Sequence, residues 1–313
     1  MADSMSVSVF IDGAVGTTGL EIRDRLAGRD DVVLVTLPDA LRKDAAARRE
    51  ALNDSDFVIL CLPDDAAREA VALIDNDRTR IIDASTAHRT AEGWSYGFPE
   101  LERSQAAAIA ESKRVTNPGC YPTGFLALVR PLVRAGLVPV DWPLTVNAVS
   151  GYSGGGKAMI AEYEGPNPPP AARAYALGLA HKHVPEMQKH ARLEHPPIFM
   201  PSVANTYRGM IVEVPLPLGM FKRRPSLQAC EAALREAYGS DSLIRIADDD
   251  ATTVQIEDDA GTDRLTLRVC GNAEAGQVRL IATLDNLGKG AAGAAVQNLN
   301  VMAGFDPLAG LIR

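Results

Sequence analysis

Cys120 is the residue whose sequence setting best suits covalent chemistry. It lies in NPGCYPTG, residues 117–124, and the apolar residues that follow at helical spacing predict a helix over 121–135. This prediction puts the sulfur at the start of a helix, where the helix dipole and the N–H groups of the first turn favour a thiolate. Asn117 and Gly119 are candidate hydrogen-bond donors to an oxyanion. The segment therefore predicts a nucleophilic thiol.

A nucleophilic thiol needs a group that removes its proton, and histidine suits this task near neutral pH. The sequence has five histidines, at positions 88, 181, 183, 190 and 195. The other cysteines, Cys61, Cys230 and Cys270, lie in apolar, alanine-rich or strand-end positions, where we expect them to pack as small hydrophobic residues. A thiol and a histidine alone are compatible with a hydrolase, a redox sensor or a reductase.

A glycine-rich turn near the N-terminus predicts a dinucleotide site. The apolar segment 7–11 leads directly into GAVGTTG, residues 13–19, and a helical pattern follows. Glycines allow a tight turn and a close approach of the backbone to a pyrophosphate, whose charge a helix N-terminus attracts. The expected cofactor contacts in this turn are Gly13, Gly16, Thr17, Thr18 and Gly19.

The residues after the second predicted strand, 32–37, favour NADP over NAD. An NAD site usually has an acidic residue at the end of this strand, which binds the ribose hydroxyls. Here no acid occurs before Asp39, and Arg42 and other basic residues follow. A base attracts the additional phosphate of NADP, whereas an acid would repel it. The further predicted contacts of an NADP cofactor include Thr36, Arg42, Cys61 and Pro63.

The elements that must position these residues follow two patterns. Apolar segments at 7–11, 32–37, 57–62 and 81–84 alternate with helical segments, which predicts parallel strands with right-handed crossovers. Later segments include 265–270 and 277–284, which alternate as antiparallel strands around a turn at 271–272. The small-residue segment near the end of the chain is helical in pattern. A length of 313 residues fits about two domains, so we predict an α/β protein with a Rossmann dinucleotide-binding domain.

Composition excludes several classes of function. The net charge of −8 argues against nucleic acid as a partner, because phosphate backbones recruit basic surfaces. The four cysteines form no CxxC pair, and no Cys/His cluster has zinc-ligand spacing, so no metal site is expected. Neither a signal peptide nor an apolar stretch of ~18 residues is evident. We therefore expect a cytoplasmic enzyme with free thiols and no membrane partner.

Seven motifs occur in an order typical of one family. They are GAVGTTG (13–19), DASTAHR (83–89), GFPEL (97–101), NPGCYPT (117–123), SGYSGGGK (150–157), HKHVPEM (181–187) and DNLGKGAAGAAVQN (285–298). In these motifs the chain resembles the N-acetyl-γ-glutamyl-phosphate reductases of arginine biosynthesis, and in length their short class. That family belongs with the aspartate-semialdehyde and glyceraldehyde-3-phosphate dehydrogenases. The resemblance covers nearly the whole chain, and NPGCYPT and HKHVPE are its most specific parts.

The resemblance implies a domain organisation and a reaction. Residues 1–117 would form an NADP-binding Rossmann domain completed by a C-terminal helix, 288–313. Residues 118–287 would form an α+β catalytic and oligomerisation domain with a mainly antiparallel sheet, in a homodimer or homotetramer. The reaction would be the NADPH-dependent reduction of N-acetyl-γ-glutamyl phosphate to N-acetylglutamate 5-semialdehyde and phosphate. It would pass through a thioacyl intermediate on Cys120.

The resemblance also implies roles for individual residues. His183 would be the acid/base, with His181 as the alternative, and Glu186 would orient the histidine or the substrate. The implied anchors for the small-molecule acyl phosphate are Ser85, Arg89, Asn117 and Lys157. The implied further cofactor contacts are Ser85, Ser153, Gly154, Asn286 and Lys289.

Three other functions fit parts of the pattern. A sister reductase would act on aspartyl phosphate or on the α-aminoadipyl analogue, and assays with each acyl phosphate separate these substrates. A redox sensor would bind NADP without turnover. A Cys-His hydrolase would need no nicotinamide, so titration with NADP distinguishes it.

Overall fold

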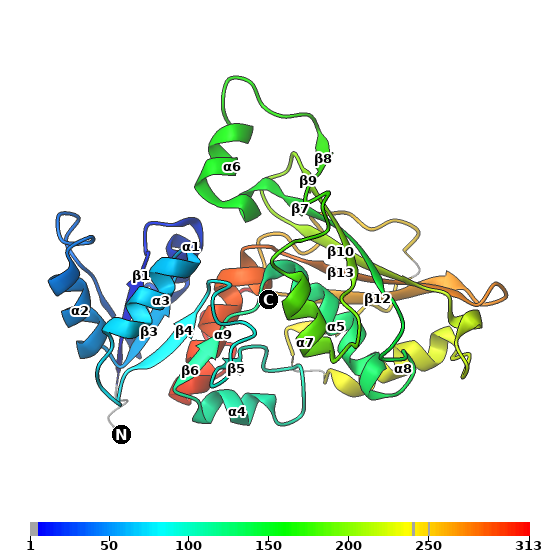
Figure 1. The fold of residues 1–313 in the computed structure, drawn as a ribbon, viewed down its shortest axis with the longest axis horizontal. Coiled ribbons are helices and arrows are strands. Elements are labelled where there is room, and N and C mark those ends of the chain that lie inside the picture. Colours follow the sequence, from blue (N-terminus) through cyan, green and yellow to red (C-terminus); the bar gives the residue numbers. More distant parts are fainter. Residues whose placement is uncertain (1–5, 240–241, 250) are drawn as a thin grey trace. The chain divides into compact units, whose positions relative to one another are not determined.

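The computed structural model describes residues 6–239, 242–249 and 251–313. The N-terminal stretch in which we expect no signal peptide begins with residues 1–5. These residues lie outside the described part of the chain. The described chain forms two compact units (Figure 1). Unit 1 comprises the described residues of Met1–Pro99, Ser104–Pro118 and Ala291–Leu311, and unit 2 those of Glu100–Arg103, Gly119–Gly290 and Ile312–Arg313.

Unit 1 contains a parallel sheet with strands in the order β2-β1-β3-β4-β6-β5. The central strand β3 is buried on both faces, which explains its continuous apolar sequence FVIL. This arrangement confirms the predicted Rossmann-type sheet. The strands are β1 (Val7–Asp12), β2 (Val32–Val35), β3 (Phe57–Leu60), β4 (Arg80–Asp83), β5 (Ser95–Tyr96) and β6 (Arg114–Thr116).

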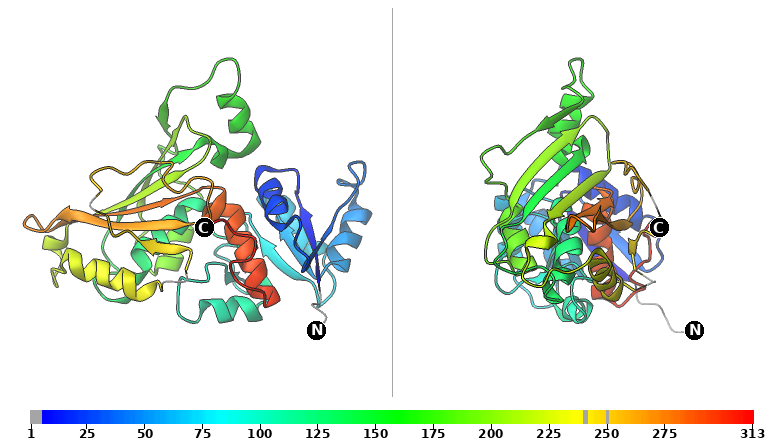
Figure 2. Two further views of the ribbon diagram at one scale, coloured as in Figure 1. Left: turned by 180° about the vertical axis from the view of Figure 1, so that it is seen from behind. Right: turned by 90° about the vertical axis from the view of Figure 1, so that its right-hand side faces the viewer.

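Helices cover both faces of this sheet. On one face Ile59 and Ile82 share a core cluster with Val296 and Leu299 of the C-terminal helix α9, coloured red in Figure 2. On the other face Leu60 packs in a second cluster. The helices of unit 1 are α1 (Thr17–Leu26), α2 (Ala45–Asp54), α3 (Asp64–Leu73), α4 (Gln105–Glu111) and α9 (Gly293–Ala303).

The predicted extent of the C-terminal helix, 288–313, is wrong at both ends. A π-helical turn occupies Gly288–Ala292, and the α-helix begins only at Gly293. It ends at Ala303 because Gly304, with φ of 75°, adopts the left-handed conformation that commonly terminates helices.

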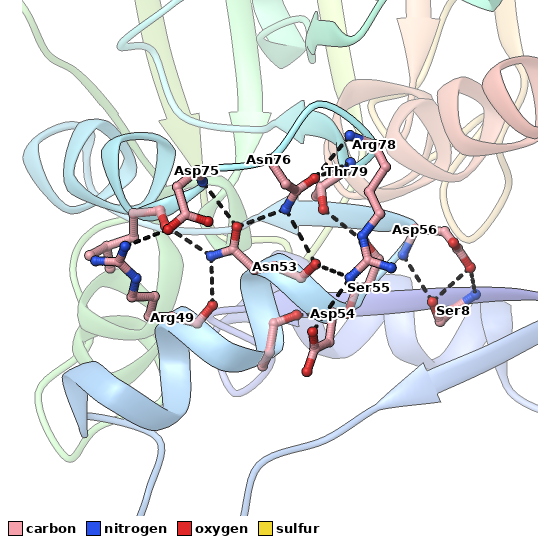
Figure 3. A network of polar contacts seen from close by, with 12 residues as sticks. Ser8, Arg49, Asn53, Asp54, Ser55, Asp56, Asp75, Asn76, Arg78 and Thr79 are labelled. Carbon is pink, nitrogen blue, oxygen red and sulfur yellow. Dashed lines mark hydrogen bonds and ion pairs between the residues drawn. The ribbon is translucent and has the colours of Figure 1, made fainter.

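A polar network holds the amino ends of β3 and β4 (Figure 3). The Asn53 side chain donates to the carbonyls of Arg49 and Leu73 and accepts from the N–H of Asp75 and the amide of Asn76. Dinucleotides bind at the opposite, carboxyl ends of parallel strands. The network therefore has a structural role at the amino ends of these strands.

Unit 2 contains a mixed sheet with strands in the order β11-β12-β13-β10-β7-β9-β8. Four of its six neighbouring pairs are antiparallel, which confirms the predicted mainly antiparallel sheet. The strands are β7 (Thr145–Gly151), β8 (Ala172–Ala174), β9 (Ile198–Ala204), β10 (Met210–Leu216), β11 (Ile244–Ile246), β12 (Leu265–Asn272) and β13 (Gln277–Leu284).

The predicted position of the β12–β13 turn is wrong. Gly271 pairs with Val278 and Asn272 pairs with Gln277, so both residues belong to the ladder and the turn lies at 273–276. A side chain at position 271 would come within 2.2 Å of the Gln277 carbonyl oxygen. Glycine is present there because the strands approach closely, not because the chain turns.

Helix α5 is the central helix of unit 2. Phe125, Leu128 and Val129 are fully buried, and a Cβ at Gly124 would lie 2.9 Å from Val212 of β10, so the helix lies directly on the sheet. Its neighbours include α7 and α8. The helices of unit 2 are α5 (Cys120–Arg134), α6 (Gly156–Tyr163), α7 (Val184–Ala191) and α8 (Leu227–Ala237).

Candidate active site and dinucleotide loop

Cys120 is the first residue of α5, one residue before the predicted start of the helix. It is half-buried, and a Cβ at Gly290 would lie 2.9 Å from the Cys120 Cβ. The third helical residue is Pro122, which has no N–H, and the Thr123 N–H bonds to the Gly119 carbonyl. The first turn therefore contributes the N–H groups of Cys120 and Tyr121 to the surroundings of the thiol.

Glu186 is bound to the turn that carries the thiol. Its side chain is 1% exposed, and Oε1 accepts the Gly119 N–H at 2.8 Å. This bond joins the first turn of α7 to the residue that caps α5. It also overturns the expectation that the Gly119 N–H stabilises an oxyanion, because the carboxylate already accepts that N–H.

Two histidines lie in an aromatic cluster beside the thiol segment. The rings of His181 and His183 are 4.7 Å apart, and Tyr121, the residue after Cys120, lies 6.2 Å and 5.8 Å from them between ring centroids. The His183 N–H donates to Nδ1 of His181 at 3.2 Å. Burial, and secondarily the neighbouring Lys182, lower the pKa of His181. Unit 2 thus brings together all four candidate catalytic residues.

Two phenols in the same cluster could not be predicted from the sequence. Tyr175 donates to the Tyr121 hydroxyl at 3.1 Å, and Tyr121 donates to the Ser202 carbonyl at 3.2 Å. Burial raises the pKa of Tyr175 to about 12, and the nearby Cys120 thiol contributes in the same direction. Both phenols are therefore protonated near neutral pH. Tyr121 lies within the NPGCYPT motif, whereas Tyr175 stands outside every motif.

The second glycine-rich loop is tied to the segment after β13. The Asn286 amide donates to Ser153 Oγ at 2.8 Å and accepts the Gly209 N–H at 2.9 Å. Gly154 lies beside it, because a Cβ there would be 3.5 Å from the Asn286 amide nitrogen. Lys157, on α6, is exposed. Unit 2 therefore brings Ser153, Gly154 and Asn286 together.

Lys289 has a different environment from the one expected of a cofactor contact. Its side chain is 1% exposed, and Nζ lies 2.9 Å from both carboxylate oxygens of Glu100. Loss of either partner would leave a buried charge uncompensated, so the segment depends on this pair.

The first glycine-rich turn of unit 1 forms a cradle that side chains would fill. A Cβ at Gly13, whose φ is +93°, would lie 2.3 Å from the Cys61 carbonyl oxygen, and one at Gly19 would lie 2.5 Å from the Gly13 carbonyl oxygen. Gly16 caps α1, and Thr17 and Thr18 begin it. Within the described residues no side chain caps the N-terminus of α1. The turn therefore fits a pyrophosphate.

The remaining candidate cofactor contacts surround the ends of β2 and β3. Thr36 follows β2, and Arg42 is paired with Asp39 at 3.2 Å. Pro63 caps α3. Cys61 is half-buried, and desolvation together with the charges of Asp83 and Asp12 raises its pKa to about 12. Cys61 is thus an unreactive thiol near the turn.

Ser85 and Arg89 are bound within unit 1. Asp83, fully buried, accepts from the Ser85 hydroxyl at 2.8 Å and from Nδ1 of His88 at 2.6 Å. Arg89 donates through Nε to the Asn117 carbonyl at 3.0 Å and through Nη2 to the Ala84 carbonyl at 3.1 Å. The sequence did not indicate that Asp83 and His88 hold this loop.

Asn117 also has its partners in unit 1. Its amide nitrogen donates to the Ala291 carbonyl at 2.8 Å, and its Oδ1 accepts from Asn298 at 3.0 Å. Over residues 6–239, 242–249 and 251–313, no three His, Cys, Asp or Glu residues are grouped to hold a metal ion. In the same residues no helix is long and apolar enough to cross a membrane.

Comparison with known proteins agrees with this geometry. Residues 38–109 match the semialdehyde dehydrogenase NAD binding domain, and residues 120–286 match the semialdehyde dehydrogenase dimerisation domain. An N-acetyl-gamma-glutamyl-phosphate reductase of Brucella ovis is 51% identical over 309 residues, which cover 96% of this chain and 100% of the relative.

Solved structures share the fold at low sequence identity. Aspartate semialdehyde dehydrogenase II from Vibrio cholerae has a TM-score of 0.70 at 17% identity, over 96% of this chain and 99% of that chain. Aspartate semialdehyde dehydrogenase with NADP from Candida albicans has a TM-score of 0.65 at 12% identity, over 95% and 99% of the two chains. From its family matches and its 51% identity, the chain belongs to the N-acetyl-γ-glutamyl-phosphate reductases, within the semialdehyde dehydrogenases.

Proposed function

We propose that the chain reduces N-acetyl-γ-glutamyl phosphate to N-acetylglutamate 5-semialdehyde and phosphate, with NADPH, in arginine biosynthesis in the cytoplasm. The observation that carries this proposal is the bond from the Gly119 N–H to Glu186, which joins the thiol turn to the HKHVPE segment. The name and the 51% identity of the Brucella relative support the choice of substrate.

In the proposed reaction the Cys120 thiolate attacks the γ-carbonyl carbon. A C–S bond forms, the C–O bond to phosphate breaks, and phosphate leaves with the electron pair. The hydride that reduces the resulting thioester would come from NADPH when it is bound. His183 donates the proton that the oxyanion takes up. His183 then takes this proton back from the hemithioacetal hydroxyl as the C–S bond breaks, so the sulfur leaves as a thiolate and the neutral aldehyde is released.

Glu186 acts as a positioning residue in this proposal. Its carboxylate holds the Gly119 N–H, so it fixes the direction in which α5 presents the thiol. Glu186 lies in the first turn of α7, which begins directly after His183. The same side chain therefore also fixes the distance between the histidine segment and the turn that carries Cys120. This assignment refines the expectation that Glu186 orients the histidine or the substrate.

We assign binding of the cofactor's pyrophosphate to unit 1, and catalysis and oligomerisation to unit 2. The turn of Gly13, Gly16, Thr17, Thr18 and Gly19 would hold the pyrophosphate. The absence of an acid at positions 36–38 supports NADP, and Arg42 is the proposed partner of its additional phosphate. The other proposed contacts on the cofactor are Thr36, Cys61, Pro63, Ser85, Ser153, Gly154 and Asn286.

The proposed anchors of the substrate are cationic and polar groups. Lys157, exposed on α6, is free to pair with a phosphate or a carboxylate as a point charge. Ser85, Arg89 and Asn117 remain candidates in unit 1. We assign Lys289, by contrast, a structural role through Glu100.

Steady-state assays in the reverse direction test the proposed activity. N-acetylglutamate semialdehyde, phosphate and NADP should give NADPH, whereas aspartate semialdehyde should be a much poorer substrate. Preference for aspartate semialdehyde would contradict the substrate assignment. NADP binding without turnover of any aldehyde would indicate the sensor, and hydrolysis without nicotinamide would indicate the hydrolase.

We further propose that the chain assembles as a homodimer or homotetramer through the sheet of unit 2. Ile198 and Met200 of β9 are each 43% exposed, and they lie on the face opposite the buried residue Phe199. A cavity of about 740 Å³ opens on the neighbouring strands, lined in part by Asn147, Glu213 and Arg279. The match to a dimerisation domain over 120–286 supports this surface.

Met200→Glu is expected to lower the solution mass toward that of a single chain. The substitution places a charge where an apolar side chain would be desolvated in the assembly, and such a charge is costly unless it is paired. Val33→Glu, at a 53% exposed position on β2 of unit 1, is the matched control. Light scattering after gel filtration measures both, and an unchanged mass for Met200→Glu would contradict the proposed surface.

A further inference from the structure

We infer that His181 acts as a neutral hydrogen-bond donor, through its Nε2–H group, to the oxygen of the acyl group on Cys120. In this role it is not the base of the reaction. The inference rests on the proposed function for its substrate, but the tautomer of the ring follows from its hydrogen bond to the His183 N–H.

The main chain at the start of α5 offers few hydrogen-bond donors to an oxyanion near the thiol. A tetrahedral intermediate requires donors aimed at its oxyanion. The Gly119 N–H is bound to Glu186, Pro122 has no N–H, and the Thr123 N–H is bound to the Gly119 carbonyl. Among the main-chain N–H groups at the start of α5, those of Cys120 and Tyr121 are the candidate donors to the oxyanion. A side-chain donor beside the turn would therefore add substantially to oxyanion stabilisation.

The hydrogen bond to the His181 ring determines its tautomer. The His183 N–H donates to Nδ1 of His181 at 3.2 Å. A ring nitrogen can accept an N–H only through a lone pair, so Nδ1 carries no proton. The proton of the neutral imidazole is then on Nε2, which makes the ring a donor at that atom. Its one basic nitrogen is occupied by the backbone, so the ring is poorly placed to remove a proton from the thiol.

The surroundings of the His181 ring determine its charge. His181 is packed against the rings of Tyr121 from α5, Tyr175 after β8 and Phe199 of β9, with centroid distances of 5.2–6.2 Å. Among the described residues, the titratable groups shown near it are these two phenols and its neighbours Lys182 and His183, with the Cys120 thiol close to both phenols, and none of these is a carboxylate that would stabilise an imidazolium. Burial lowers its pKa, which keeps the ring neutral near neutral pH.

The two histidines therefore have different roles in the reaction. His181 polarises the acyl oxygen without changing its protonation, as neutral imidazoles can do when their pKa is lowered. His183 remains the group that exchanges a proton. The closeness of the two rings, 4.7 Å between centroids, allows both to serve one reacting carbonyl.

Two substitutions at position 181 separate the donor from the acceptor. His181→Gln keeps an N–H donor near the position of Nε2, and we expect it to retain kcat within about tenfold. His181→Asn keeps an acceptor for the His183 N–H near the position of Nδ1 but removes the distal donor. We expect it to lower kcat by about 10²–10³-fold, as for the loss of an oxyanion donor. Both variants should keep the pH profile of the wild type.

The tautomer is measured separately, by ¹⁵N NMR of histidine-labelled protein, with the Gln variant identifying the His181 signal. A protonated Nε2 and an unprotonated Nδ1 at neutral pH are expected. A proton on Nδ1, a charged ring, or a Gln variant as inactive as the Asn variant would each overturn the inference. A wild-type protein without reductase activity would contradict the proposed function instead, and the NMR spectrum would still decide the tautomer.

Discussion

Replacing Cys120 with alanine is expected to lower kcat by about 10⁴-fold or more while the fold and NADPH binding persist. The substitution removes only Sγ, and with it the C–S bond that divides the reaction into two easier steps. The Cβ that packs against Gly290 is retained, and the thiol is half-buried, so little packing is lost. The next three residues of α5 are Tyr121, Pro122 and Thr123, and none of them carries a thiol.

The matched control for this variant is Cys270→Ala. Cys270 is also half-buried, but it lies at the outer part of the β12–β13 ladder and pairs with Arg279. We expect its kcat to stay within about twofold of the wild type. Steady-state rates, with NADPH binding followed by fluorescence, measure both variants. Substantial turnover by the Cys120 variant would rule out the covalent mechanism.

Gly13→Ala is expected to destabilise unit 1 and weaken the binding of NADPH. Its Cβ would lie 2.3 Å from the Cys61 carbonyl oxygen, and φ of +93° disfavours any side chain. The clash and the strained backbone together should cost roughly 3 kcal/mol or more. If the turn moves to relieve this strain, the pyrophosphate cradle opens. The affinity for NADPH should then fall by about 100-fold, which corresponds to a loss of that size.

Gly28→Ala separates the clash from the effect of φ. Gly28 also belongs to unit 1 and also has a positive φ, +76°, but a Cβ there would meet nothing within 4 Å. It should cost only about 1–2 kcal/mol and leave NADPH affinity unchanged. Thermal unfolding and NADPH titration compare the pair. Equal affinity in the two variants would show that the Gly13 turn does not hold the cofactor.

Local features of this chain could be predicted from the sequence with good accuracy. The start of α5 was predicted within one residue, because apolar residues at helical spacing follow Cys120 and depend only on neighbouring positions. Four of the six parallel strands of unit 1, β1 to β4, were predicted from apolar runs that alternate with helices, whereas the short strands β5 and β6 were not. Gly271 misled the prediction because glycine permits both a turn and a close approach of strands, and only the pairing distinguishes these.

Long-range contacts could not be predicted. Glu186 and Gly119 are separated by 67 residues, and their bond depends on how α7 packs beside α5. Lys289 looked like a surface or cofactor cation because Glu100 is 189 residues away. The tautomer of His181 depends on one backbone N–H in the turn before α7. The sequence could name the candidate residues, whereas their individual tasks depend on such contacts.

The central claim, a thioacyl intermediate on Cys120, is tested most directly by a single-turnover experiment without phosphate. Mixing the enzyme with N-acetylglutamate semialdehyde and NADP should give a burst of about one NADPH per active site. Mass spectrometry should then find an N-acetylglutamyl group on the peptide that contains Cys120. NADPH formation with no acylated Cys120, or an equal burst from Cys120→Ala, would contradict the account.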